Sequence, residues 1–203
     1  MISKLRMIVL TKSYKDHAYC VAGLNCNDFK WIRLVTDDEN FCGAIEKRDI
    51  RHINPLDVIE LFVKDYPKIN YRFQKENLLI DENYDIKKVK TSSLKDVINI
   101  HPPENHEFLF GNNSGAIHEE NDILDDVHSS LMFIKVENLK LSENNKASFI
   151  YNEQNFSHFS LTDPDYYHNQ EIAIGSAYLV ISFPEIPFDY GNYYKFIAKI
   201  FLK

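Results

Sequence analysis

The stretch from Ala18 to Val35 has the pattern of a β-hairpin, and it constrains the fold of this chain more than any other feature. Two apolar, β-prone runs flank the turn-forming residues 25–28. Because neighbouring side chains of a strand point to opposite faces, Ile32 and Leu34 are expected to face a core. The hairpin therefore predicts a protein built from short antiparallel strands.

On the other face of the same strand, Trp31 lies beside Arg33, and it is the only tryptophan in the chain. An aromatic ring can stack on a nucleobase, and a guanidinium beside it can hold a phosphate. The same two side chains could instead form a cross-strand pair that stabilises the sheet, or a contact between barrels. We predict Trp31 and Arg33 as ligand-binding residues.

The composition is that of an acidic protein with enough apolar residues for a real core. The chain has 203 residues, 44% of them hydrophobic, and a formal net charge of −7. Non-specific nucleic-acid binding depends on phosphate neutralisation by Lys and Arg, so this charge argues against a general nucleic-acid coat protein. It leaves room for a local binding groove, which depends on the charge near the site.

Cysteines and apolar runs indicate a cytoplasmic protein. The three cysteines all lie in the first quarter, and their number and spacing fit neither a disulfide framework nor a zinc motif. The apolar run at residues 5–10 is too short and too interrupted by charge for a signal peptide. The sequence also lacks the apolar run of about 18 residues that a membrane span needs, so we expect no membrane partner.

The order of patterns along the chain predicts a mainly β protein with two small β-barrels. About five strand-like runs fill the first eighty residues, which suits a small barrel at residues 1–90. Residues 91–127 begin with a short amphipathic helix and continue as a polar connector. The β pattern then resumes in a second barrel at residues 128–203. Residues 18–33 and 177–197 share an outline, which either an internal duplication or chance convergence of hairpins explains.

Several separated pieces occur in order along nearly the whole chain: Cys20–Gly23, Trp31–Arg33, Glu76–Asn77, Phe149–Tyr151, Leu161–Pro164, Leu179–Ser182 and Tyr194–Ala198. Together they resemble the dual OB-containing domain (DuOB) family of bacteria. The sequence departs from that pattern at Leu34, where proline is more typical, and at residues 183–187, where Leu-Gly-Glu-Pro would be expected. Neither departure removes a polar group from a candidate site.

The resemblance implies two OB-like barrels and a role connected with nucleic acid in prokaryotic antiviral or conflict systems. OB barrels commonly bind single strands across the face of their second and third strands, which is where Trp31 and Arg33 are expected. The resemblance supplies no established catalytic residues.

Residues in the second half add further candidates for a ligand site. Thr162, Asp163 and His168 bring a hydroxyl, a carboxylate and an imidazole close together, as an acid–base pair would need. Thr or Asp before proline is also an ordinary turn or helix cap. Tyr194 and Lys195 should point to opposite faces of a strand, so that one of them can meet a ligand. The predicted ligand-binding residues of this half are Tyr151, Thr162, Asp163, His168, Tyr194 and Lys195.

We predict no metal and no cofactor. His101, Glu104 and His106 lie close in sequence, but zinc needs further ligands and the two prolines between them prevent a helical arrangement. The chain contains no phosphate-binding loop, dinucleotide fingerprint or nucleophile elbow. Enzymatic activity therefore stays open. The leading hypothesis is a protein that binds single-stranded RNA or DNA, or a nucleotide ligand. The alternatives are an enzyme that modifies or cleaves nucleic acid or nucleotides, and an adaptor for a protein effector encoded nearby.

Overall fold

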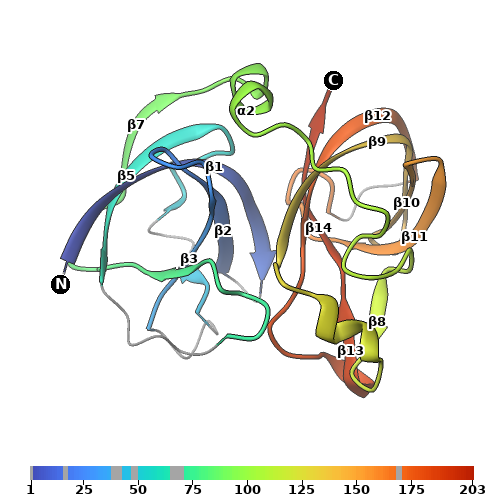
Figure 1. The fold of residues 1–203 in the computed structure, drawn as a ribbon. Helices are drawn as coiled ribbons and strands as arrows, with labels where there is room; N and C mark the ends of the chain where they lie inside the picture. Colours follow the sequence, from blue (N-terminus) through green and yellow to red (C-terminus); the bar gives the residue numbers. More distant parts are fainter. Residues whose placement is uncertain (1, 16–17, 38–42, 47–49, 65–70, 168–170) are drawn as a thin grey trace. The chain divides into compact units, whose positions relative to one another are not determined.

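The computed structural model describes all residues except 1, 16–17, 38–42, 47–49, 65–70 and 168–170. It confirms a mainly β protein, and it divides into two compact units (Figure 1). The first unit is Met1–Asn70 with Glu76–Pro102, and the second is Tyr71–Lys75 with Pro103–Lys203. Residues 91–127, the expected connector, are thus shared between the two units.

The first unit contains seven strands and one helix among its described residues: β1 (Ile2–Lys15), β2 (Ala18–Asn25), β3 (Trp31–Val35), β4 (Ile45–Glu46), β5 (Asp57–Lys64), β6 (Asn77–Leu79), β7 (Lys87–Thr91) and α2 (Leu94–Ile100).

Strand pairing in the first unit almost closes a ring. β1 pairs antiparallel with β2 and β5, β2 pairs antiparallel with β3, and β3 pairs parallel with β6. A single antiparallel bridge between Val63 and Ile80 joins the end of β5 to the residue after β6. Apolar side chains such as Val21, Ile32 and Leu34 form the core inside this ring. The core face expected for the Ala18–Val35 hairpin is therefore confirmed.

Local signals place the helix and the hairpin turn where the sequence predicts them. Ser93 caps α2, because its hydroxyl accepts from the Asp96 amide while the Asp96 carboxylate accepts from Ser93. At the turn between β2 and β3, the Phe29 amide donates to the carbonyl of Asn25 at 2.9 Å.

The second unit contains seven strands and two 3-10 helices among its described residues: β8 (Ala116–His118), η2 (Asp122–Asp126), β9 (Leu131–Ser142), β10 (Lys146–Tyr151), β11 (Gln154–Leu161), β12 (Ile172–Ser182), η3 (Asp189–Gly191), β13 (Asn192–Tyr194) and β14 (Phe196–Leu202).

Five of these strands form a closed barrel in the order β10, β11, β14, β12 and β9 (Figure 1). In this barrel β11 pairs parallel with β14, just as β3 pairs parallel with β6 in the first unit. Within its own ring, each of these pairs joins the third strand along the chain to the fifth. The two units therefore share one connectivity. In this comparison β2 and β3 correspond to β10 and β11. Residues 177–197 instead hold the end of β12 and the start of β14, so the outline that they share with residues 18–33 does not mean that the two stretches occupy equivalent positions in their barrels.

A short piece of chain between β5 and β6 belongs to the second unit. In this piece, Tyr71–Lys75, the ring of Phe73 is fully buried and lies edge-on to Phe183 and Tyr193, with ring centroids 5.2 and 5.4 Å apart. The Glu185 carboxylate accepts hydrogen bonds from the backbone amides of Arg72, Phe73 and Gln74 at 2.5, 2.9 and 2.8 Å. We call this piece the Phe73 segment.

Candidate nucleic-acid interface

Arg33 is buried within the first unit, so its guanidinium does not stand on an open face. The residue is only 6% exposed, and its Nε lies 3.2 Å from the Glu76 carboxylate. Ala22 and Leu24, on the same face of the neighbouring strand, are also buried. Trp31 is half-buried, with its ring edge-on to His101 at 5.6 Å. The alternation along β3 is as predicted, but the side chains on the face of Arg33 are covered.

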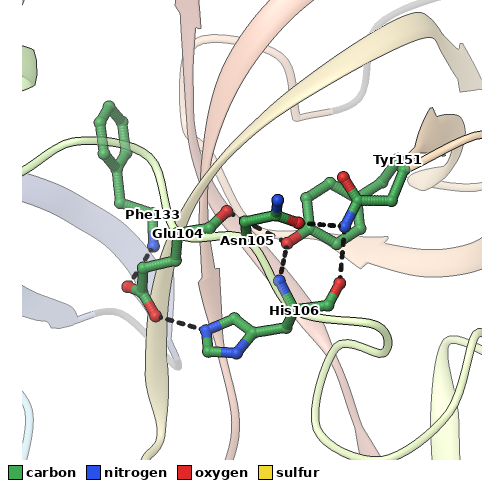
Figure 2. A network of polar contacts seen from close by, with 6 residues as sticks. Glu104, Asn105, His106, Phe133 and Tyr151 are labelled. Atoms are coloured by element: carbon green, nitrogen blue, oxygen red, sulfur yellow. Dashed lines mark hydrogen bonds and ion pairs between the residues drawn. The ribbon is translucent and has the colours of Figure 1, made fainter.

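Tyr151 holds a piece of chain against the second barrel. Its buried hydroxyl accepts from the His106 amide at 2.6 Å and donates to the Glu104 carbonyl at 3.1 Å (Figure 2). The Glu104 carboxylate accepts from the Phe133 amide at 3.0 Å and contacts the His106 imidazole at 2.9 Å. Burial raises the pKa of the Tyr151 phenol. These contacts give Tyr151 a structural role.

Asp163 is fully buried and forms the turn that ends β11. Its carboxylate accepts from the amides of Ile200 and Asp165 at 2.8 and 3.1 Å, and it lies 3.2 Å from the Lys199 ammonium. Burial raises the pKa of Asp163. Thr162 beside it donates its amide to the Ile197 carbonyl. These contacts are those of a structural turn, not of an acid–base pair. His168 lies outside the described residues.

Lys195 is fully buried, while Tyr194 is half-exposed, as the strand alternation predicts. The Lys195 ammonium donates to the carbonyl and side-chain oxygens of Asn112 at 2.9 and 2.6 Å. It also lies 5.7 Å from the centroid of the Phe159 ring. Burial lowers the pKa of Lys195 to about 7. Of these two side chains, that of Tyr194 is therefore the one that solvent reaches.

The lowered pKa of Lys195 makes stability depend on pH. In the unfolded chain this lysine keeps its proton up to its ordinary pKa of 10.5, whereas in the folded protein it releases the proton above about 7. Between these values the unfolded state binds more protons, so the contribution of Lys195 to the free energy of unfolding rises with pH. The free energy of unfolding of the wild type, minus that of Lys195→Met, should therefore increase by up to about 1.4 kcal/mol per pH unit. Urea unfolding at pH 6–10 measures it; a difference independent of pH would contradict the prediction.

Tyr194 belongs to a group of aromatic rings with a lysine on the outer face of the second barrel. The Lys146 ammonium lies 5.1 Å from the centroid of the Tyr194 ring and donates to the Ser160 hydroxyl at 2.8 Å. The Phe188 ring lies 6.0 Å from that of Tyr194 and 5.5 Å from that of Phe196. Burial lowers the pKa of Lys146. We call these residues, with Tyr190, the aromatic–lysine face.

The loop between β12 and β14 presents apolar side chains to solvent beside this face. Phe188 is 48% exposed and Tyr190 is 92% exposed. Tyr190 has a φ of 57°, in the left-handed region that non-glycine residues seldom adopt. Sequence reasoning missed Lys146, Phe188 and Tyr190. The signal that could have found them is two aromatic residues in a proline-containing loop between strands.

A hollow of about 300 Å³ adjoins Lys146 on the same barrel. Lys140 and hydroxyl-bearing side chains from β10 and β11, Ser148 and Ser157 among them, line it. Ammonium and hydroxyl groups are the donors that phosphate and sugar oxygens need. The hollow thus brings these donors, together with the Glu171 carboxylate, to the neighbourhood of Lys146.

Charge is divided unevenly between the two units. By sequence, the first unit has fifteen Lys and Arg against fifteen Asp and Glu, and the second has eight against fifteen. The whole net charge of −7 therefore belongs to the second unit. A ligand on the aromatic–lysine face would gain more from stacking than from phosphate neutralisation.

The shared strand connectivity defines a protein of two OB-type barrels. The chain belongs to the dual OB-containing domain family (DuOB), whose pattern it matches over residues 5–200. No curated protein sequence matches it.

Similar solved structures include three HIN domains. The p204 HINb domain has a TM-score of 0.42 and 10% identity, covering 96% of this chain and 91% of that chain. The Ifi202 HINa domain in complex with 20bp dsDNA has a TM-score of 0.39 and 13% identity, covering 99% and 97%. The tetrameric p202 HIN2 has a TM-score of 0.35 and 13% identity, covering 100% and 92%. At these scores and identities the similarity says nothing about a shared ligand.

Within the described part of the chain, the helices are all too short or too polar to cross a membrane.

Proposed function

We propose that this protein binds single-stranded nucleic acid, or a nucleotide-like ligand, on the aromatic–lysine face of the second barrel. The observation that carries the proposal is the exposed Phe188 ring, 6.0 Å from the Tyr194 ring, which in turn has the Lys146 ammonium 5.1 Å from its centroid. Tyr190, which is 92% exposed, follows Phe188 by two residues in the same loop. This face lies on the second and third strands and the loop before the fifth, where OB barrels bind oligonucleotides.

In this proposal the bases stack and the phosphates contribute little. A base on an aromatic ring is worth roughly 1–3 kcal/mol, and every base has a face to stack. Lys146 and Lys140 are the cations next to the rings and the hollow. Because each phosphate contact on a single strand contributes about −0.7 to the slope of log affinity against log salt, two contacts give a slope of about −1.4. A shallow salt dependence is the signature of this mode.

Removing an exposed ring should weaken binding without unfolding the protein. We expect Tyr190→Ala and Phe188→Ala each to lower affinity for single-stranded oligonucleotides by about 5- to 150-fold. Fluorescence anisotropy with labelled RNA and DNA at several salt concentrations measures affinity and slope together. Phe108→Ala, which removes a ring 38% exposed against 48% for Phe188, is the matched control for Phe188→Ala. No binding by wild type at low salt, or equal affinity in all variants, would refute the proposal.

We further propose a role in a prokaryotic antiviral or conflict system, which the family resemblance supports. A phage challenge of cells that carry the gene with its neighbours tests this role. Protection should fall with Tyr190→Ala if nucleic-acid binding is needed. If protection persists in that variant and a neighbouring effector copurifies, the adaptor alternative is favoured instead.

A further inference from the structure

The first unit carries a cavity of about 850 Å³ that the proposed interface does not use. The chain around residues 51–52, the turn at 80–85 and the start of β7 line it. Small-molecule sites in proteins commonly occupy about 300–1,000 Å³. The cavity is therefore large enough for a mononucleotide.

Buried or shielded polar contacts fix the walls of this cavity. The Lys12 ammonium donates to the carbonyls of Ile50 and Ile53 at 3.0 and 2.8 Å and so holds the chain on both sides of residues 51–52. The His52 imidazole lies 3.1 Å from the Ile86 carbonyl, which ties this wall to the opposite one. A binding site needs such fixed walls, because a mobile wall would have to be ordered when the ligand binds.

The turn at 81–84 presents one aromatic ring in a defined position. The Asp81 carboxylate accepts from the amide and side chain of Asn83, and the Asp81 carbonyl accepts from the Tyr84 amide at 3.1 Å. The Tyr84 ring is backed by Phe62, with centroids 4.4 Å apart, and the residue remains 47% exposed. Tyr84 thus has one face supported by protein and a surface left for a flat ligand.

Charges of both signs surround the ring. The cationic residues Arg51 and Lys87 line the cavity, as do the acidic residues Glu82 and Asp85. Lys88 lines it too, but its ammonium is paired with the buried Asp57 carboxylate at 2.7 Å. Cations favour a phosphate, whereas carboxylates accept hydrogen bonds from N–H groups at the edge of a base. A simple inorganic anion would not need the aromatic ring or the carboxylates.

We propose that this cavity binds a nucleoside 5′-phosphate, with the base against Tyr84 and the phosphate near Arg51 and Lys87. The ligand is either a free mononucleotide or the 5′-phosphorylated end of a strand. This proposal does not rest on the function proposed for the second barrel, because it uses different residues in the other unit.

Calorimetric titration of the full chain tests the proposal. The probes are the four common nucleoside 5′-monophosphates, the matching nucleosides, inorganic phosphate, and an oligonucleotide with a 5′-phosphate or a 5′-hydroxyl end. We expect at least one monophosphate to bind more tightly than its nucleoside and than phosphate. If the mononucleotide binds and the two oligonucleotides bind equally well, the ligand of the cavity is a free mononucleotide. If the oligonucleotide with a 5′-phosphate binds more tightly than the one with a 5′-hydroxyl, the ligand is the phosphorylated end of a strand.

Variants locate the binding. Arg51→Gln and Lys87→Gln should each weaken monophosphate binding about tenfold, because each removes a charged hydrogen-bond donor. Tyr84→Ala should weaken it by a similar factor. Lys90→Gln, which removes an exposed cation on the same strand outside the cavity, should leave it unchanged. No binding at millimolar monophosphate, or the same loss in Lys90→Gln as in Lys87→Gln, would overturn the proposal.

Discussion

Replacing Phe73 by alanine is expected to lower the free energy of unfolding of the second unit by about 3–5 kcal/mol. The ring is fully buried between Phe183 and Tyr193, so its removal leaves a cavity among aromatic side chains. Glu185→Gln should cost less, about 1–3 kcal/mol, since it weakens the hydrogen bonds to the three backbone amides without emptying the core.

Hydrogen exchange read by mass spectrometry measures this effect for each unit separately. Amides of β9 to β14 should lose protection in Phe73→Ala. The fluorescence of Trp31 reports on the first unit, because it is the only tryptophan in the chain. Phe108→Ala, at a partly exposed ring, is the control and should cost less than about 1 kcal/mol. A loss below about 1 kcal/mol in Phe73→Ala would mean that the Phe73 segment is not part of the core.

Replacing Asp163 by alanine should cost about 3–5 kcal/mol, because it leaves the buried Lys199 ammonium without its buried partner. It also removes the acceptor of the Ile200 amide. Chemical denaturation measures the change.

Two further variants separate loss of charge pairing from loss of packing. Asp165→Asn removes the second carboxylate that contacts Lys199, but its side chain is 70% exposed, so we expect a cost of about 0–1 kcal/mol. Asp163→Leu combined with Lys199→Met should recover most of the stability lost in Asp163→Ala, because no charge is then left buried. If the double variant is as unstable as the single one, the ion pair is not the cause.

Periodicity predicted the elements whose partners are close in sequence. The hairpin of β2 and β3 and the helix α2 both appear where alternation, turn residues and an amphipathic pattern indicated them. Each is specified by its own residues.

The place of the segment after β5, which depends on distant partners, was not predicted. Residues 71–80 have the pattern of a single extended piece, yet only Asn77–Leu79 form a strand and the Phe73 segment packs in the other unit. Nothing within those ten residues shows that Phe183 and Tyr193 lie around Phe73, because they follow more than a hundred residues later.

Sequence pattern identified only some residues of the candidate site, because the others come together through contacts between distant parts of the chain. Alternation correctly placed Arg33 on the face of β3 opposite the core cluster, but it could not show that Glu76 pairs with Arg33 or that the face is covered. It separated Tyr194 from Lys195, and the structure then added Lys146 and Phe188, whose proximity comes from the barrel.

The Phe73 segment also limits how this protein can be divided or recombined. The chain passes from one unit to the other after Asn70, returns after Lys75 and crosses again after Pro102. A gene fragment for residues 103–203 would lack Phe73 and would therefore encode a barrel without the ring that packs between Phe183 and Tyr193. A single cut in the chain therefore cannot separate the two units, because five residues of the second lie within the sequence of the first.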